Sequence, residues 1–277
     1  MAQDSLLHWA AHAQLERLRG RLDDARKIYQ TVLLSLRPPA TALGLPILWY
    51  NWAELEWLAG ENQEVTKIIF RSMDIEVTNS GVAFLKAKRK LEDAAEALTS
   101  STLETTKMKE REAWVKLRAL LEIITVKDAA SMLQVFDRYL HLEDQTNAAR
   151  ESMTMGGLVM LYRYGVVLKN PMPPMILRER ASIALEAFPG NSVILSIFLE
   201  GEKGQGVWGN VRGMLGDNEV DIGKTKDVAR RIEEVWIAGW EKGRWKSEVE
   251  RTRSGLAGAV ESERCVFTGL ASVDIFI

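Results

Sequence analysis

Residues 9–28 read WAAHAQLERLRGRLDDARKI, and residues 49–68 read WYNWAELEWLAGENQEVTKI, forty residues further along the chain. The large aromatic, the small residue, the acid and the glycine each recur at their own place. A fixed period of this length is typical of helical repeat arrays, which bind partners and seldom catalyse reactions. The repeated pairs are Trp9 and Trp49, Ala13 and Ala53, Leu15 and Leu55, Glu16 and Glu56, Gly20 and Gly60, Ala25 and Val65, and Ile28 and Ile68.

Helical spacing of apolar residues extends well beyond these two stretches. Gly20 and Gly60 are expected just past a helix end, where a left-handed backbone is needed. Pro38 and Pro39 stop the helix before them, and Pro46 suits a first helical turn. The sequence predicts helices at 5–19, 22–36, 46–59, 62–73, 81–99, 104–124, 127–141, 144–168, 174–187, 191–202, 206–215, 225–242 and 245–261.

These helices predict an all-α fold, a continuous α-solenoid of antiparallel helix pairs over residues 1–265. The segment Asn170–Pro174 interrupts the helical pattern and is a candidate subdomain seam. Residues Val266–Ile277 have a β-like composition with no strand partner nearby. A solenoid needs a polar cap on its last repeat, so we expect this apolar tail to be poorly ordered and to promote self-association.

Composition excludes several classes of protein. The 277 residues are enough for one or two domains. The net charge of -2 argues against a protein that binds nucleic acid through electrostatic attraction alone. The single cysteine, Cys265, cannot form a disulfide within the chain, which predicts a reducing compartment. We find no apolar run long enough to span a bilayer and no signal sequence, and therefore expect no membrane partner.

The repeated residues have two interpretations. Trp9 and Trp49 are either an aromatic ligand platform or, as we favour, packing residues between the two helices of each repeat, where Ala13 and Ala53 allow close approach. The acids Glu16 and Glu56 are expected to be structural, because neither has a second acid at a spacing suited to acid–base catalysis.

Metal binding is not expected. His8, His12 and Glu16 share one helical face, but the first and last are about 12 Å apart along a helix, too far to hold one ion. The third histidine, His141, has no obvious partner.

A nucleotide site is not expected either. Gly223-Lys224-Thr225 resembles the end of a phosphate-binding loop, but Asn218 stands where that loop needs a glycine, and no strand leads in. Cys265 has no convincing histidine partner and is expected to be an ordinary free thiol. We therefore predict no catalytic, cofactor-binding or metal-binding residues, and no cofactor.

Two regions are rich in basic residues, Lys86–Lys90 (KAKRK) and 224–253. Trp236, Trp240 and Trp245 are interleaved with the second, a combination that suits single-stranded RNA. The favoured alternative is a solvated helix face over a tryptophan core. KAKRK also fits a nuclear import signal, although short basic runs are common on helices. Direct RNA contact therefore stays open.

The spacing of the repeated residues resembles the half-a-tetratricopeptide (HAT) repeat, found in scaffold proteins of RNA processing. The resemblance is clear for residues 9–33 and 49–73 and becomes degenerate afterwards. It implies HAT/TPR-like helix pairs.

A narrower resemblance is to the C-terminal half of the nuclear RNAi-defective (NRDE two) family. Three blocks and their order carry it. They are 48–57 (LWYNWAELEW), 184–199 with Glu202 and 207–212 (VWGNVR), and 259–265 (AVESERC).

This resemblance implies a nuclear, non-enzymatic scaffold in RNA interference, heterochromatin-linked silencing and nuclear RNA surveillance. It also implies association with splicing factors and with the RNA helicase of the nuclear exosome. The chain departs from the family at Glu200-Gly201 and lacks the long polar N-terminal region that carries the helicase contact, so we expect a fragment. The alternative function is a HAT scaffold of pre-mRNA splicing, 3′-end processing or ribosome assembly. A helical enzyme is disfavoured, because no catalytic constellation is present.

Overall fold

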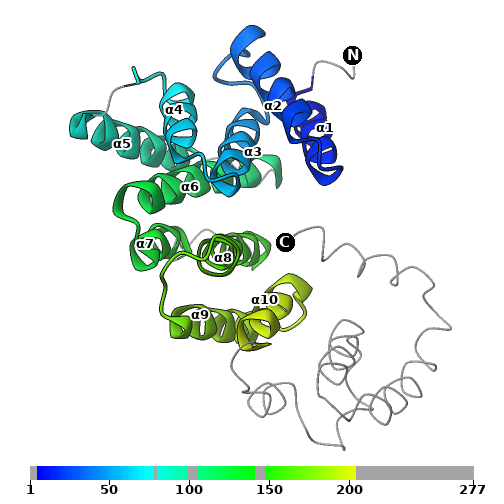
Figure 1. Cartoon of the computed structure of the whole chain (residues 1–277), viewed down its shortest axis with the longest axis vertical. Coiled ribbons are helices and arrows are strands. Elements are labelled where there is room, and N and C mark those ends of the chain that lie inside the picture. The colour runs from blue at the N-terminus through cyan, green and yellow to red at the C-terminus, as the bar shows by residue number, and fades with distance from the viewer. Residues whose placement is uncertain (1–4, 78–79, 99–104, 141–146, 204–277) are drawn as a thin grey trace, which may run out of the picture. The chain divides into compact units, whose positions relative to one another are not determined.

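The computed structural model describes residues 5–77, 80–98, 105–140 and 147–203 (Figure 1). Within these ranges the chain forms α-helices and two π-helical turns, with no β-strand, which confirms the predicted all-α fold for this part. None of the helices described is long and apolar enough to cross a membrane. The predicted helices at 206–215, 225–242 and 245–261, and the tail Val266–Ile277, lie outside the described residues.

The ten α-helices described match the predicted ranges closely. They are α1 (Leu6–Leu18), α2 (Leu22–Gln30), α3 (Leu45–Leu58), α4 (Asn62–Ser72), α5 (Gly81–Ala97), α6 (Thr105–Val126), α7 (Ala129–Leu140), α8 (Asn147–Tyr162), α9 (Pro174–Ala187) and α10 (Ser192–Lys203).

Two predicted helices end in a π-helical turn rather than in regular α-helix. These turns are η2 (Thr31–Ser35), which follows α2, and η3 (Arg163–Val167), which follows α8. Each is closed by a backbone hydrogen bond across five residues, as in the 3.0 Å bond from the Leu36 N–H to the Thr31 carbonyl. The predicted helix 22–36, and the described part of the predicted helix 144–168, are thus helical nearly to their ends but finish in π-helical geometry.

The chain divides into two units, Met1–Gly157 and Leu158–Ile277, with the division inside α8. In the second unit α9 packs against α10. Residues 168–173 form the non-helical connection between η3 and α9, and include the segment where the sequence predicts a break in the helical pattern.

The first two helix pairs, α1–α2 and α3–α4, have the same turn. Gly20 and Gly60 have φ angles of 75° and 86°, in the left-handed region that favours glycine. The N–H groups of Arg21 and Glu61 each donate to a carbonyl five residues back, on Glu16 and Glu56, and both bonds measure 2.9 Å. This is the Schellman arrangement of a helix C-terminus, and it confirms the predicted role of both glycines.

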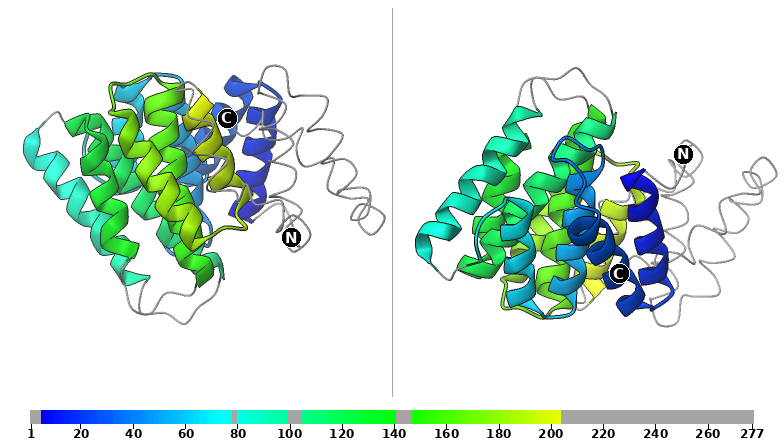
Figure 2. Two further views of the ribbon diagram at one scale, coloured as in Figure 1. Left: turned by 90° about the horizontal axis from the view of Figure 1, so that it is seen from below. Right: turned by 90° about the horizontal axis from the view of Figure 1, so that it is seen from above.

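The contacts between helix pairs also recur. Helix α3 packs against both α1 and α2, and α6 packs against both α3 and α4. Helix α6 packs in turn against α7, so α6–α7 repeats the arrangement of the first two pairs. Helix α5 is an additional helix that lies against α6 (Figure 1). It is on the opposite side of the first unit from α1, as Figure 2 shows from two directions.

Three of the seven repeat residues recur in this third pair. Ala119, Leu121 and Glu122 in α6 have the spacing of Ala53, Leu55 and Glu56 in α3. This partial match was not predicted, because Glu122 follows Glu56 by 66 residues instead of 40, with α5 inserted between them.

Small and aromatic side chains fill the space between the first two pairs. Ala13 and Ala53 are fully buried, as expected for residues that allow close helix approach. The Trp52 ring lies between Tyr29 and Trp49, with centroids 6.4 Å and 6.0 Å away.

The two tryptophans of the repeat are not equally covered. Trp49 is buried as expected, whereas Trp9 is only half-buried. Helix α3 packs closely against α1, α2, α4 and α6, but α1 packs closely against α2 and α3. The same repeat position is therefore covered to a different degree in each pair.

Candidate partner-binding site

Buried carboxylates join the first two helix pairs. Glu16 is 6% exposed and accepts a hydrogen bond from Arg19 at 2.8 Å. Glu56 is held from both sides, by the Arg26 guanidinium at 2.9 and 3.0 Å and by the Trp52 indole N–H at 3.2 Å. Because Arg26 belongs to α2 and Glu56 to α3, this pair fastens one helix pair to the next. Glu56 thus lies at a helix contact, as predicted, whereas the ion-pair partners Arg19 and Arg21 of Glu16 belong to the end of its own helix and the turn that follows.

A third acid at the same junction was not predicted. Glu54 lies on α3, accepts a 2.6 Å bond from Arg17 of α1 and also accepts the hydroxyl hydrogen bond of Tyr50. The sequence feature that could have identified Glu54 is its position within a run of apolar residues in α3. A buried acid in such a run needs a donor from a neighbouring helix.

The candidate metal ligands do not converge. His8 and His12 are exposed, and His12 Nε2 lies 3.9 Å from the Glu16 carboxylate that Arg19 already holds. In the part of the chain that the structure describes, no three histidine, cysteine, aspartate or glutamate side chains are placed to hold a metal ion. His141 lies outside the described residues.

The basic run Lys86–Lys90 is only partly a solvated face. Lys86 and Arg89 are exposed, as predicted. Lys88 lies 2.8 Å from the Glu122 carboxylate of α6, and Lys90 donates to the carbonyl of Met73 at 2.7 Å. Two of the four cations thus hold α5 against α6 and against the end of α4.

Several other predicted residues lie outside the described ranges. They are Gly223-Lys224-Thr225, the basic region 224–253 with Trp236, Trp240 and Trp245, and Cys265.

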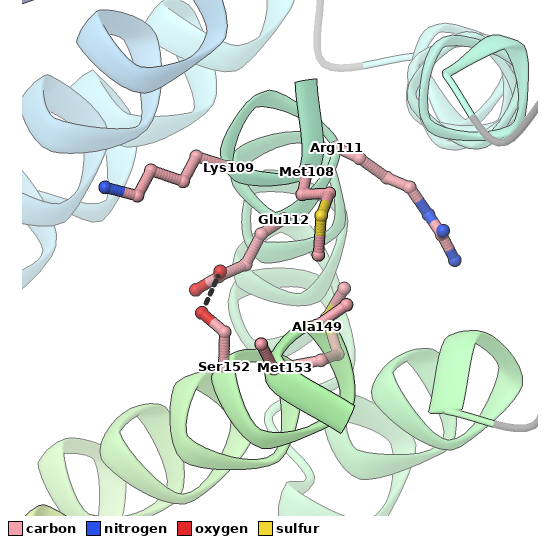
Figure 3. A pocket seen from close by; sticks show the side chains of 8 residues that line it. Met108, Lys109, Arg111, Glu112, Ala149, Ser152 and Met153 are labelled. Carbon is pink, nitrogen blue, oxygen red and sulfur yellow. Dashed lines mark hydrogen bonds between the residues drawn. The ribbon is translucent and has the colours of Figure 1, made fainter. Parts of the chain in front are cut away.

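A cleft of about 200 Å³ lies between the first turns of α6 and of α8, within the first unit (Figure 3). Its floor is mostly apolar, and charged side chains stand on both sides. Figure 3 shows Arg111 and Glu112 leaving α6 in opposite directions, with the methionines between them. The lining residues are Met108, Lys109, Arg111, Glu112, Ala148, Ala149, Ser152 and Met153.

The acidic side of the cleft is already neutralised. Ser152 of α8 donates to the Glu112 carboxylate at 2.6 Å, and Lys116 lies 2.6 Å from the same carboxylate. Lys116 also sits over the Tyr50 ring, 5.2 Å from its centroid, which ties this corner of the cleft to α3. Glu112 therefore has little capacity left to bind an external cation.

The basic side is not neutralised. The Nε and one Nη atom of Arg111 are buried and have no hydrogen-bond partner within the described ranges of the chain. The guanidinium lies over the Tyr139 ring at 5.6 Å, a contact that offsets part of the cost of burying its charge. Burial lowers the pKa of Arg111 below its ordinary value. Burial likewise raises the pKa of Tyr139, to about 12. At neutral pH an arginine side chain stays charged, so Arg111 is a cation of the cleft with no anionic partner among the residues that the structure describes.

None of these cleft residues was predicted from the sequence. Arg111 and Ser152 are about forty residues apart, and neither lies in a recognisable motif.

Comparison of the chain with protein-family models, with curated proteins and with solved structures gave no match.

Proposed function

We propose that this chain is a non-enzymatic helical-repeat scaffold of nuclear RNA silencing and nuclear RNA surveillance, built as an α-solenoid of HAT/TPR-like helix pairs. The architectural part of this proposal is supported by the recurrence of one packing arrangement in α1–α2, α3–α4 and α6–α7. Repeat units of this kind present long surfaces to protein partners. The resemblance to the NRDE two family carries the assignment to nuclear RNA silencing.

The environment of the buried acids supports a structural interpretation of the repeat junctions. Glu54 and Glu56 are engaged by arginines of the preceding helix pair, and Glu122 is engaged by Lys88 and Arg118. Charges that are paired in this way fix the register between helices. They leave no free carboxylate at these three positions for acid–base chemistry.

The proposal is tested by affinity purification of the tagged full chain from nuclear extract, followed by mass spectrometry, with the tag alone as control. We expect silencing factors, splicing factors and the exosome RNA helicase to co-purify, and the tagged chain to be concentrated in the nucleus by microscopy. Recovery of a stable splicing, cleavage or ribosome-assembly complex without silencing factors would favour a scaffold of that machine instead.

A second measurement tests the non-enzymatic part. Purified chain is assayed for hydrolysis of ATP, RNA and simple esters, and none is expected above the level of a Glu54→Gln, Glu56→Gln variant. A turnover that this double variant abolishes would contradict the proposal.

A further inference from the structure

We propose that the cleft between α6 and α8 binds a short peptide of a partner protein in which an aliphatic side chain lies next to a carboxylate. The aliphatic side chain occupies the floor formed by Met108, Ala149 and Met153, and the carboxylate pairs with Arg111. This inference rests on the proposed scaffold role, because it names the chemistry of a partner, but it does not depend on the nuclear assignment.

The floor of the cleft suits an aliphatic side chain. Met108 and Met153 face each other across it with Ala149 beside them (Figure 3). Methionine is unbranched and polarizable, so a pair of methionines adapts its shape to a bound side chain. The volume of about 200 Å³ is below the roughly 300–1,000 Å³ typical of sites for whole small-molecule ligands. A single large side chain therefore fits the space better than a cofactor does.

The charge of the cleft selects an acidic neighbour. Among the described residues, two guanidinium nitrogens of Arg111 have no hydrogen-bond partner, Lys109 is exposed at the rim, and Glu112 is neutralised by Lys116 and Ser152. The uncompensated charge in the cleft is thus positive. A carboxylate supplied by a partner matches the positive charge of the planar guanidinium.

An RNA phosphate would satisfy the same cation, but the rest of the cleft disfavours it. The residues beside Arg111 are methionine and alanine, whereas a site for single-stranded RNA combines cations with aromatic faces for base stacking. The Tyr139 ring is already covered by Arg111 itself. We therefore treat RNA as the competing outcome of the test.

The test uses fluorescent twelve-residue peptides with one leucine and a glutamate placed one to four residues away, and the same peptides with lysine in place of glutamate. Binding to the full chain is measured by fluorescence anisotropy. We expect a glutamate peptide to bind and its lysine counterpart not to bind. Arg111→Met is expected to weaken binding on the order of 30-fold, as when one partner of a desolvated charge pair is removed. Ala149→Leu, which fills the floor, is also expected to weaken it.

Arg71→Met is the matched control, because it removes an exposed guanidinium outside the cleft and is expected to leave affinity unchanged. Thermal unfolding checks that each variant folds. Arg111→Met is expected to unfold at or above the wild-type temperature, since it replaces an unpaired buried charge by an apolar side chain.

Three results would overturn the inference. They are the absence of binding by every glutamate peptide, equal binding by wild type and Arg111→Met, and displacement of the peptide by an RNA oligonucleotide whose own binding needs Arg111. Failure of the proposed function is separate. If the peptide binds but no nuclear RNA-processing partners co-purify, only the nuclear assignment is overturned. If those partners co-purify but the cleft binds no peptide, only this inference is overturned.

Discussion

Leu15 and Leu55 occupy the same position of two consecutive helix pairs, yet the Leu15 side chain is 45% exposed and the Leu55 side chain is 3% exposed. Both follow the repeated alanine by two residues and precede the repeated acid. The difference arises from their neighbours, because α3 packs closely against four helices and α1 against two. One repeat position can therefore be a core site in one pair and a surface site in another.

We expect Leu55→Ala to lower the free energy of unfolding by about 2–5 kcal/mol, the usual cost of emptying a core leucine site. Leu15→Ala is expected to cost about 0.5 kcal/mol or less, as for a surface substitution. Urea unfolding followed by circular dichroism measures both. Similar costs for the two variants would show that the pairs do not stack as described.

Two buried tyrosines provide a second matched comparison. The Tyr29 hydroxyl has no hydrogen-bond partner, whereas the Tyr50 hydroxyl donates to Glu54. Tyr29→Phe is expected to be neutral or stabilising by up to about 1 kcal/mol, because it removes an unsatisfied polar group. Tyr50→Phe is expected to cost about 1–3 kcal/mol, because it takes a donor from a buried carboxylate. A larger loss from Tyr29→Phe than from Tyr50→Phe would contradict this assignment.

Glycine substitutions test the left-handed turns of the repeat. Gly60 has φ 86°, and an alanine there is expected to cost about 1–2 kcal/mol through backbone strain alone, since nothing lies within 4 Å of the added carbon. Gly81, in the first turn of α5, has no positive φ and equally open surroundings. Gly81→Ala is therefore expected to stabilise by about 0.4–1 kcal/mol. Thermal unfolding should move in opposite directions for the two variants.

The stability of the α5–α6 junction should depend on pH through Glu122. Burial alone would raise the pKa of this carboxyl, but hydrogen bonds from Lys88 and Arg118 outweigh it and hold the pKa below its ordinary value of 4.5. A carboxyl with a depressed folded-state pKa contributes stability above its unfolded pKa, and this contribution is lost as the pH falls through the folded value. The stability difference between wild type and Glu122→Gln should thus shrink from about pH 6 to about pH 3.

Unfolding in urea at each pH measures this difference. Glu186→Gln, which removes an exposed carboxylate of α9, is the control for general acid effects. A wild-type advantage over Glu122→Gln that stays constant on acidification would argue against the ion pairs with Lys88 and Arg118.

Local structure was largely determined by the amino-acid sequence alone. The predicted helices in the described residues agree with the structure to within a few residues at most ends, because apolar spacing, glycine and proline act on the nearest turns of the chain. The left-handed conformations of Gly20 and Gly60 were predicted for the same reason.

Only the tertiary structure decided which helix covers which. The apolar spacing of α5 resembles that of a repeat helix, yet α6 occupies the place next to α3 and α4, and α5 lies outside it. Neither the exposure of Leu15 nor the cleft with its unpaired Arg111 could be predicted, because both depend on helices distant in sequence. Periodicity reveals which face of a helix is apolar, but the helix that buries that face is selected by competition among all the faces of the folded chain.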